Sequence, residues 1–275
     1  MTGNLFLSFD GTKIEADVLA ANKPRAGVLF WPCMGGSFQM YRFPREEFLR
    51  RGISVVLFNP RGHGASGGQM EISLALRDVD HLLAKNGLTG LPFVGIGHSA
   101  GANALLQYAA DKESFLRFFL VAPVLDSRRS LEYLYAEGNI REFNDILALR
   151  AGKTDVISEH LNDSRWMDGD YWREMNLRRY MDGKSGELQI GSFLENLFIP
   201  GHNAFNLLQK EASRTDILLA VEDHWYPLEE TRAKAREYGI SLREISQARD
   251  HFFTRAWPPV WEYIIGEIDK LRLPG

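Results

Sequence analysis

The residues best suited to chemistry lie at 97–101 and read Gly-His-Ser-Ala-Gly. The apolar run at 91–96 predicts a buried parallel strand, and the Ala- and Leu-rich residues at 102–110 favour a helix. A serine at so tight a strand-to-helix turn has a strained backbone, and only glycine fits two positions to either side. Ser99 is therefore a candidate nucleophile for acyl chemistry. That chemistry also requires a base, an acid that orients the base, and N–H donors for an oxyanion.

Composition indicates a globular protein and excludes several other classes. The chain has 275 residues, 45% of them hydrophobic and 25% charged, which is typical of a globular protein. A net charge of −4 gives no electrostatic reason to expect a nucleic-acid partner. Its single cysteine excludes an intramolecular disulfide and a multi-cysteine zinc site. No apolar run approaches the length of a membrane span, and no signal peptide is evident, so we expect a cytoplasmic protein.

The elements that must position Ser99 alternate along the first half of the chain. Residues 4–20 alternate apolar and polar side chains around Asp10-Gly11, which predicts two antiparallel strands. Buried strands are predicted at 27–31, 53–58, 91–96 and 118–125, with helices at 43–51, at 77–86 and after Ser99. Strands and helices in this order indicate a parallel sheet with right-handed crossovers.

A long interval then separates two strands. The strand at 216–221 begins 91 positions after residue 125 (216 − 125 = 91). We interpret 127–214 as an inserted helical cap, with helices near 130–136 and 139–149. Residues 1–126 and 215–275 would form the core, which ends with a helix at 228–238, a strand at 241–245 and a helix entered through Pro258-Pro259.

A second motif follows the strand at 53–58. Residues 59–68 read Asn-Pro-Arg-Gly-His-Gly-Ala-Ser-Gly-Gly. This stretch resembles the Arg-Gly-His-Gly-x-Ser-x-Gly loop of α/β-hydrolases in the monoacylglycerol-lipase and serine-aminopeptidase-like branch. The resemblance covers nearly all of the chain outside the predicted cap. It implies the α/β-hydrolase fold, a mostly parallel central sheet flanked by helices, and the activity of a serine hydrolase. We interpret the loop itself as a structural turn.

The resemblance also implies the partners of Ser99. In α/β-hydrolases the acid and the histidine follow the nucleophile in that order, each on a loop after a sheet strand. Asp223, just after the strand at 216–221, is then the acid, and His251 is the base. Glu222 and Asp126, which lies at the end of the strand at 118–125, stay open as alternatives for the acid.

Position separates His251 from the other six histidines. His98 lies inside the motif and is expected to point away from Ser99, and His63 lies in the glycine-rich loop. The rest lie on a helix, in the predicted cap or beside the proposed acid: His81, His160, His202 and His224. Only His251 lies on a core loop after the acid.

The family's oxyanion hole uses the N–H of the residue after the nucleophile and one from the loop after the strand at 27–31. These are Ala100 and Met34 here, although Pro32 and Cys33 replace the family's usual His-Gly. A backbone N–H needs no particular side chain, so the departure does not remove the donor. Cys33 is expected to be an apolar filler rather than a nucleophile, because the tight strand-to-helix turn holds serine.

The expected activity is hydrolysis of a carboxylic ester through a covalent acyl-enzyme on Ser99, with no metal or organic cofactor. Three alternatives stay open. They are a thioesterase or acyltransferase acting on acyl-CoA or acyl-carrier substrates, a C–C bond hydrolase, and a non-enzymatic ligand-binding protein of the same fold. The expected partner is a small-molecule acyl substrate, and homo-oligomer formation is left open.

Overall fold

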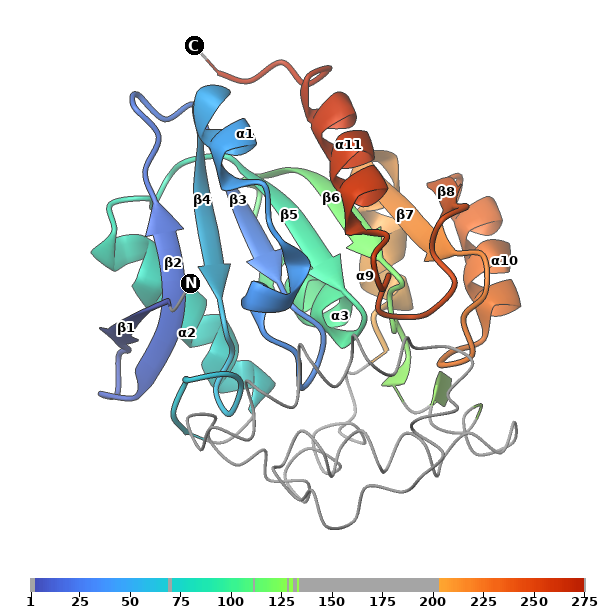
Figure 1. Ribbon diagram of the computed structural model, residues 1–275, viewed down its shortest axis with the longest axis horizontal. Helices are drawn as coiled ribbons and strands as arrows, with labels where there is room; N and C mark the ends of the chain where they lie inside the picture. The colour runs from blue at the N-terminus through green and yellow to red at the C-terminus, as the bar shows by residue number, and fades with distance from the viewer. Residues whose placement is uncertain are drawn as a thin grey trace.

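A computed structural model describes residues 3–68, 71–110, 112–127, 129–130, 133 and 203–274. Its centre is an eight-stranded sheet with the strand order β1-β2-β4-β3-β5-β6-β7-β8 (Figure 1). β1 pairs with β2 and β2 with β4 in antiparallel fashion, and every other pairing is parallel. The predicted fold class, a mostly parallel sheet flanked by helices, is confirmed.

The strands carry the core. Their bounds are Asn4–Leu7 (β1), Lys13–Leu19 (β2), Ala26–Trp31 (β3), Ile53–Phe58 (β4), Phe93–His98 (β5), Phe115–Val121 (β6), Thr215–Ala220 (β7) and Ser241–Ile245 (β8). Every residue of β3, β4, β5 and β7 is buried. Parallel strands covered on both faces have this continuous apolar character, which is why the sequence shows runs rather than alternation at these positions.

Helices cover both faces of the sheet. They are α1 (Arg45–Arg50), α2 (Ile72–Lys85), α3 (Ala100–Ala109), α9 (Phe205–Lys210), α10 (Leu228–Tyr238) and α11 (Trp257–Ile268), with short 3-10 turns at Phe38–Tyr41 (η1) and Ala212–Arg214 (η5). In Figure 1, α1 and α11 lie in front of the sheet and α2 and α3 behind it. No helix within the described ranges is long and apolar enough to cross a membrane.

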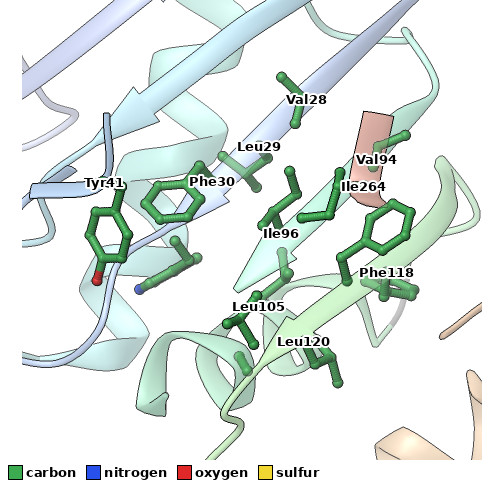
Figure 2. Close-up of a cluster of buried hydrophobic side chains, with 14 of the residues drawn as sticks. Val28, Leu29, Phe30, Tyr41, Val94, Ile96, Leu105, Phe118, Leu120 and Ile264 are labelled. Atoms are coloured by element: carbon green, nitrogen blue, oxygen red, sulfur yellow. The ribbon is translucent and has the colours of Figure 1, made fainter. Parts of the chain in front are cut away.

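The buried side chains form one continuous cluster around β3 and β5. Figure 2 shows Val28, Phe30, Val94 and Ile96 from these strands packed with Leu105 of α3 and other side chains of the sheet. Phe30 makes edge contacts with the rings of Tyr41, Phe43 and Trp261. Side chains of β3, η1 and α11 meet in this cluster. The loop after β3, which lies between β3 and η1, is therefore held at both of its ends.

Two predicted elements have different limits in the structure. α2 begins at Ile72, five residues before the predicted start at 77, because Ile72, Ala75 and Leu76 extend its apolar face toward the core. β6 spans Phe115–Val121 rather than 118–125. The strand ends where Ala122 takes a positive φ of 41° and Pro123 has no N–H to donate.

The other strand and helix predictions are close to the observed elements. The hairpin around Asp10-Gly11 is confirmed by the register Leu7↔Lys13, and α10 and β8 match their predicted bounds. The helices expected at 130–136 and 139–149 lie outside the described residues except for isolated positions, and the cap boundary at 127–214 stays a prediction. Within that range, α9 contacts α3.

A buried ion pair anchors the loop after β4. Arg61 donates from Nε to Asp78 Oδ2 (2.6 Å) and from Nη2 to Asp78 Oδ1 (2.7 Å), so the pair is bidentate. The Asp78 side chain is fully buried and that of Arg61 is 4% exposed. Arg61 Nη1 also donates to Asp10 Oδ2 at 2.8 Å, which joins the loop to the first hairpin.

Breaking this pair should be far more costly than breaking a surface pair. Arg61→Met leaves the Asp78 carboxylate buried without its cation, which typically costs 3–5 kcal/mol. Arg50→Met, which removes an exposed pair with Glu47, should cost about 0–1 kcal/mol. Urea unfolding of both variants measures the difference, and equal losses would contradict the anchoring role of Arg61.

Candidate active site

Ser99 lies at the turn between β5 and α3 with φ 58° and ψ −129°, a positive-φ conformation that is unusual for a residue with a side chain. The two glycines of the motif make this turn possible. A Cβ on Gly97 would lie 2.5 Å from Ala102 Cα, and a Cβ on Gly101 would overlap the carbonyl oxygen of Pro32. Nearby backbone atoms therefore leave room only for glycine at both positions, as the sequence predicts.

Three side chains from separate loops meet at this turn. Ser99 Oγ lies 2.7 Å from His251 Nε2, and His251 Nδ1 lies 2.8 Å from Asp223 Oδ2. A carboxylate only accepts, so His251 donates from Nδ1 to Asp223, and Nε2 is left to accept the Ser99 proton. The three residues named from the sequence form one continuous hydrogen-bonded chain.

The surroundings hold this chain in place. Asp223 and His251 are buried, and Asp223 Oδ1 also accepts the Trp225 N–H at 2.9 Å. The Trp225 ring stacks on the His251 imidazole, with centroids 5.5 Å apart and an angle of 10°. Burial, with a contribution from the Asp223 charge, raises the pKa of Tyr226 well above its usual value of 10, so its hydroxyl stays protonated beside His251.

The two alternative acids lie elsewhere. Glu222 forms a surface ion pair with Arg249 at 2.7 Å. Asp126 accepts the Arg129 N–H at 2.9 Å and the Asn203 side-chain amide at 2.8 Å, and it bridges to Asn203 outside the sheet. Among the three acids weighed from the sequence, Asp223 is the one bonded to His251.

The two expected oxyanion donors, Met34 and Ala100, both line a cavity between α2, α3 and the loops after β3 and β4. The loop that carries Met34 is held by neighbours on both sides. Gly35 donates its N–H to His63 Nε2 (2.8 Å), and Cys33 donates its N–H to Tyr41 Oη (2.8 Å). The loop at 59–68, interpreted from the sequence as a structural turn, thus supports the loop that carries Met34 through His63.

His98 connects the same loop to His251. Tyr41 Oη accepts the Cys33 N–H, and its hydroxyl donates to His98 Nδ1, 2.9 Å away. His98 then carries its proton on Nε2 and donates it to the carbonyl of His251 at 2.8 Å. His98 points away from Ser99, as expected, and its ring joins the backbone of His251 to the Met34 loop.

Sequence reasoning did not identify this connection. A polar ring at position 98, inside a buried strand, is a signal that it needs hydrogen-bond partners. No sequence pattern identifies Tyr41 as one of them, because the contact joins residues 57 positions apart. Within the described residues, no group of His, Cys, Asp or Glu side chains could hold a metal ion.

This fold and this serine define a class of protein, the α/β-hydrolases. A family model described as serine aminopeptidase, S33, matches residues 22–179, more than half of the chain. The chain belongs to this family. No curated protein matches it in sequence.

Solved structures share the fold across almost the whole chain. A carboxylesterase of the ammonia-oxidizing thaumarchaeon Nitrososphaera gargenis has a TM-score of 0.73 at 16% identity, covering 97% of this chain and 98% of its own. A thermophilic esterase from Thermogutta terrifontis has a TM-score of 0.68 at 18% sequence identity, and the match covers 98% of each chain. A soluble variant of monoglyceride lipase from Saccharomyces cerevisiae has a TM-score of 0.64 at 17% identity, and the match covers 98% of this chain and 94% of the lipase.

A second buried carboxyl group lies next to His251. Burial, followed by a smaller effect of the Asp223 charge, raises the pKa of Asp250 to about 6, against hydrogen bonds that lower it. Its Oδ1 accepts the Phe252 N–H at 2.8 Å and the Thr254 hydroxyl at 3.1 Å. The group therefore shapes the loop that carries His251, and it is neutral in the folded protein at acidic pH.

The raised pKa predicts a pH-dependent stability. Below pH 3.8 both folded and unfolded states hold the proton. As the pH rises through 6 the folded state must ionise a buried group, so the stabilisation is lost. Asp250→Asn keeps an accepting oxygen without this cost. It should leave stability near pH 4 almost unchanged and add up to about 3 kcal/mol above pH 7.

Denaturant unfolding at pH 4, 6 and 8 measures this dependence, with the exposed Glu113→Gln as the control variant. A difference between Asp250→Asn and the parent protein that is the same at all three pH values would contradict it.

Proposed function

We propose that the protein is a serine hydrolase that cleaves carboxylic esters through a covalent acyl-enzyme on Ser99. The observation that carries the proposal is the continuous chain Asp223–His251–Ser99, with spacings of 2.8 and 2.7 Å. Membership of a hydrolase family and the fold shared with esterases support a hydrolase in general. The serine at the positive-φ turn supports a nucleophile rather than a scaffold residue.

The mechanism follows from the direction of each hydrogen bond. His251 Nε2 takes the Ser99 proton as Oγ attacks the carbonyl carbon, and the N–H groups of Met34 and Ala100 stabilise the oxyanion. Asp223 fixes the Nδ1–H tautomer and stabilises the imidazolium. His251 then protonates the leaving alcohol, and a water activated by the same nitrogen releases the acid and restores Ser99.

Two other hypotheses about the enzyme's substrate remain beside ester hydrolysis. Thioesters, as in acyl-CoA or acyl-carrier substrates, present the same carbonyl to the same groups, and a C–C bond hydrolase would use them on a ketone. We favour an ester substrate because the similar solved structures include a carboxylesterase, an esterase and a monoglyceride lipase. The ligand-binding alternative requires no nucleophile, so labelling of Ser99 separates it from all three enzymes.

Removal of the nucleophile should abolish turnover without unfolding the protein. Ser99→Ala is expected to lower kcat on p-nitrophenyl esters by more than about a thousandfold, because no covalent intermediate can form. Intact-mass measurement after treatment with a fluorophosphonate should show one adduct on the parent protein and none on the variant. Ser66→Ala is a matched control at another buried serine.

An unlabelled parent protein that remains folded would contradict the catalytic reading and favour a ligand-binding protein. A labelled protein that hydrolyses acyl-thioesters orders of magnitude faster than matched esters would favour the thioesterase reading instead.

Tyr41 and His98 act as positioning residues in this mechanism. Tyr41→Phe removes the hydroxyl that joins the Cys33 N–H to His98, so both the oxyanion loop and the backbone of His251 lose a fixed partner. We expect kcat to fall about tenfold to a hundredfold with little change in KM, since the lost geometry matters in the transition state.

Steady-state kinetics on one ester measure the split between kcat and KM. Tyr108→Phe is the matched control, because Tyr108 is also buried and donates to Asp80, away from the site. If the two variants lose stability equally and neither changes kcat, the positioning role of Tyr41 is wrong.

A further inference from the structure

Glu15 is a buried acidic residue that the mechanism above does not use. It lies on β2 and is 5% exposed, and four N–H groups surround its carboxyl group. Oε1 accepts from the side chain of Gln39 (2.6 Å) and the backbone of Gly3 (3.2 Å). Oε2 accepts from the side chain of Asn59 (2.6 Å) and the backbone of Ala65 (2.8 Å). Donors on both oxygens are the surroundings that a carboxylate requires, because it can accept hydrogen bonds but cannot donate them.

We infer that Glu15 is a positioning residue for the oxyanion hole, and that its carboxylate fixes the two loops that hold the Met34 N–H in place. The inference rests on the proposed function, in which that N–H stabilises the oxyanion. It extends the machinery of the site to a strand that carries none of the residues named from the sequence.

The first connection runs to the loop after β3. Asn59 donates from Nδ2 to Glu15 Oε2, which leaves Asn59 Oδ1 to accept the N–H of Phe38 at 2.9 Å. Phe38 begins η1, and the side chain of Gln39 ties the same turn to Glu15 Oε1. Met34 lies between β3 and η1. Both bonds therefore fix one end of the segment that carries the proposed donor.

The second connection runs to the loop after β4. Ala65 donates its N–H to Glu15 Oε2. Two positions earlier in the same loop, His63 Nε2 accepts the N–H of Gly35 at 2.8 Å. Because Gly35 directly follows Met34, the carboxylate is linked to the neighbour of the proposed donor through this loop as well as through η1.

Gly64, the second glycine of the Arg-Gly-His-Gly motif, shows how closely this loop packs on the carboxylate. A Cβ at this position would lie 2.2 Å from Asn59 Nδ2 and 2.7 Å from Glu15 Oε2. Any side chain at 64 would displace the acceptor or its donor. The glycine therefore lets the loop backbone lie directly against Glu15.

An amide at position 15 would have the same size but one wrong group. In either orientation of a glutamine, its NH2 faces two N–H donors. If Gln39 turned over to offer its oxygen, its own NH2 would face that of Asn59, 3.2 Å from the present oxygen. If Asn59 turned over instead, its NH2 would face the Phe38 N–H. The mismatch therefore passes from the sheet to η1 in both cases.

The experiment replaces Glu15 by its amide and measures turnover, oxyanion binding and stability. Glu15→Gln should lower kcat on a p-nitrophenyl ester about tenfold to a hundredfold and change KM by less than about threefold, because a misplaced donor matters in the transition state. A trifluoromethyl ketone forms an adduct with Ser99 that places an alkoxide at the oxyanion position. Its Ki should rise by the factor by which kcat/KM falls.

Asp216→Asn is the matched control. It also replaces a buried carboxylate by its amide, but Asp216 lies near the start of β7, where it accepts from Arg117 at 2.7 Å, and Asp223 follows the other end of that strand. This variant should lower the free energy of unfolding in urea and leave kcat and Ki within about twofold of the parent values. A merely structural role of Glu15 predicts the same result for Glu15→Gln.

Gln39→Met is the second variant. Gln39 is half-buried, and its replacement removes one donor to Glu15 while the carboxylate stays in place. We expect kcat to fall about twofold to tenfold, with a matching rise in the Ki of the ketone. This variant decides the question if Glu15→Gln does not fold.

A folded Glu15→Gln protein with the kcat and Ki of the parent would overturn the inference. So would a loss of kcat/KM that arises from KM, a loss of kcat without the rise in Ki, or an unfolded Glu15→Gln together with an unchanged Gln39→Met. In each of these cases the parent protein still turns over and reacts with the fluorophosphonate. Failure of the proposed function differs from them, because the parent protein then shows neither.

Discussion

The close approach of α3 to the loop after β3 is the constraint on which the site depends. The helix begins directly after Ser99, and at Gly101 its backbone leaves no room for a Cβ against Pro32. This contact places the first turn of α3, with Ala100, against the loop that carries Met34. It also forces Ser99 into a positive φ. A larger residue at 101 would push the first turn of α3 away from the loop that carries Met34.

The strained turn is stabilised by the sheet around it. Ser99 donates its N–H to the carbonyl of Val121, and its own carbonyl accepts from Val124 and Ala102. The end of β6 therefore holds the backbone of Ser99, and Ala122, which has a positive φ, donates its N–H to the carbonyl of Leu218 in β7. Strain at functional turns persists only where the surroundings determine the conformation more than once. Here the last residue of β6 and Val124 bond the Ser99 backbone directly, and β7 holds the end of β6 in turn.

Most of the fold, and Ser99 as a candidate site residue, could be predicted from the sequence, because both depend on local patterns. Buried strands appear in the sequence as apolar runs. The glycines two positions before and after Ser99 reflect the steric limits of one short turn. The order of acid and histidine in the α/β-hydrolases that the chain resembles, rather than a local pattern, indicated Asp223 and His251, which the structure joins to Ser99 by hydrogen bonds. The limits of β6 were wrong, since Ala122 and Pro123 end the strand inside an apolar run.

What the sequence did not show are contacts between residues far apart in the chain. The path from Cys33 through Tyr41 and His98 to the carbonyl of His251 spans more than 200 positions, and each of its steps is a side-chain hydrogen bond between separate elements. Residue types alone do not reveal such partners. The position of His98 in a buried strand predicts only that its ring must be satisfied.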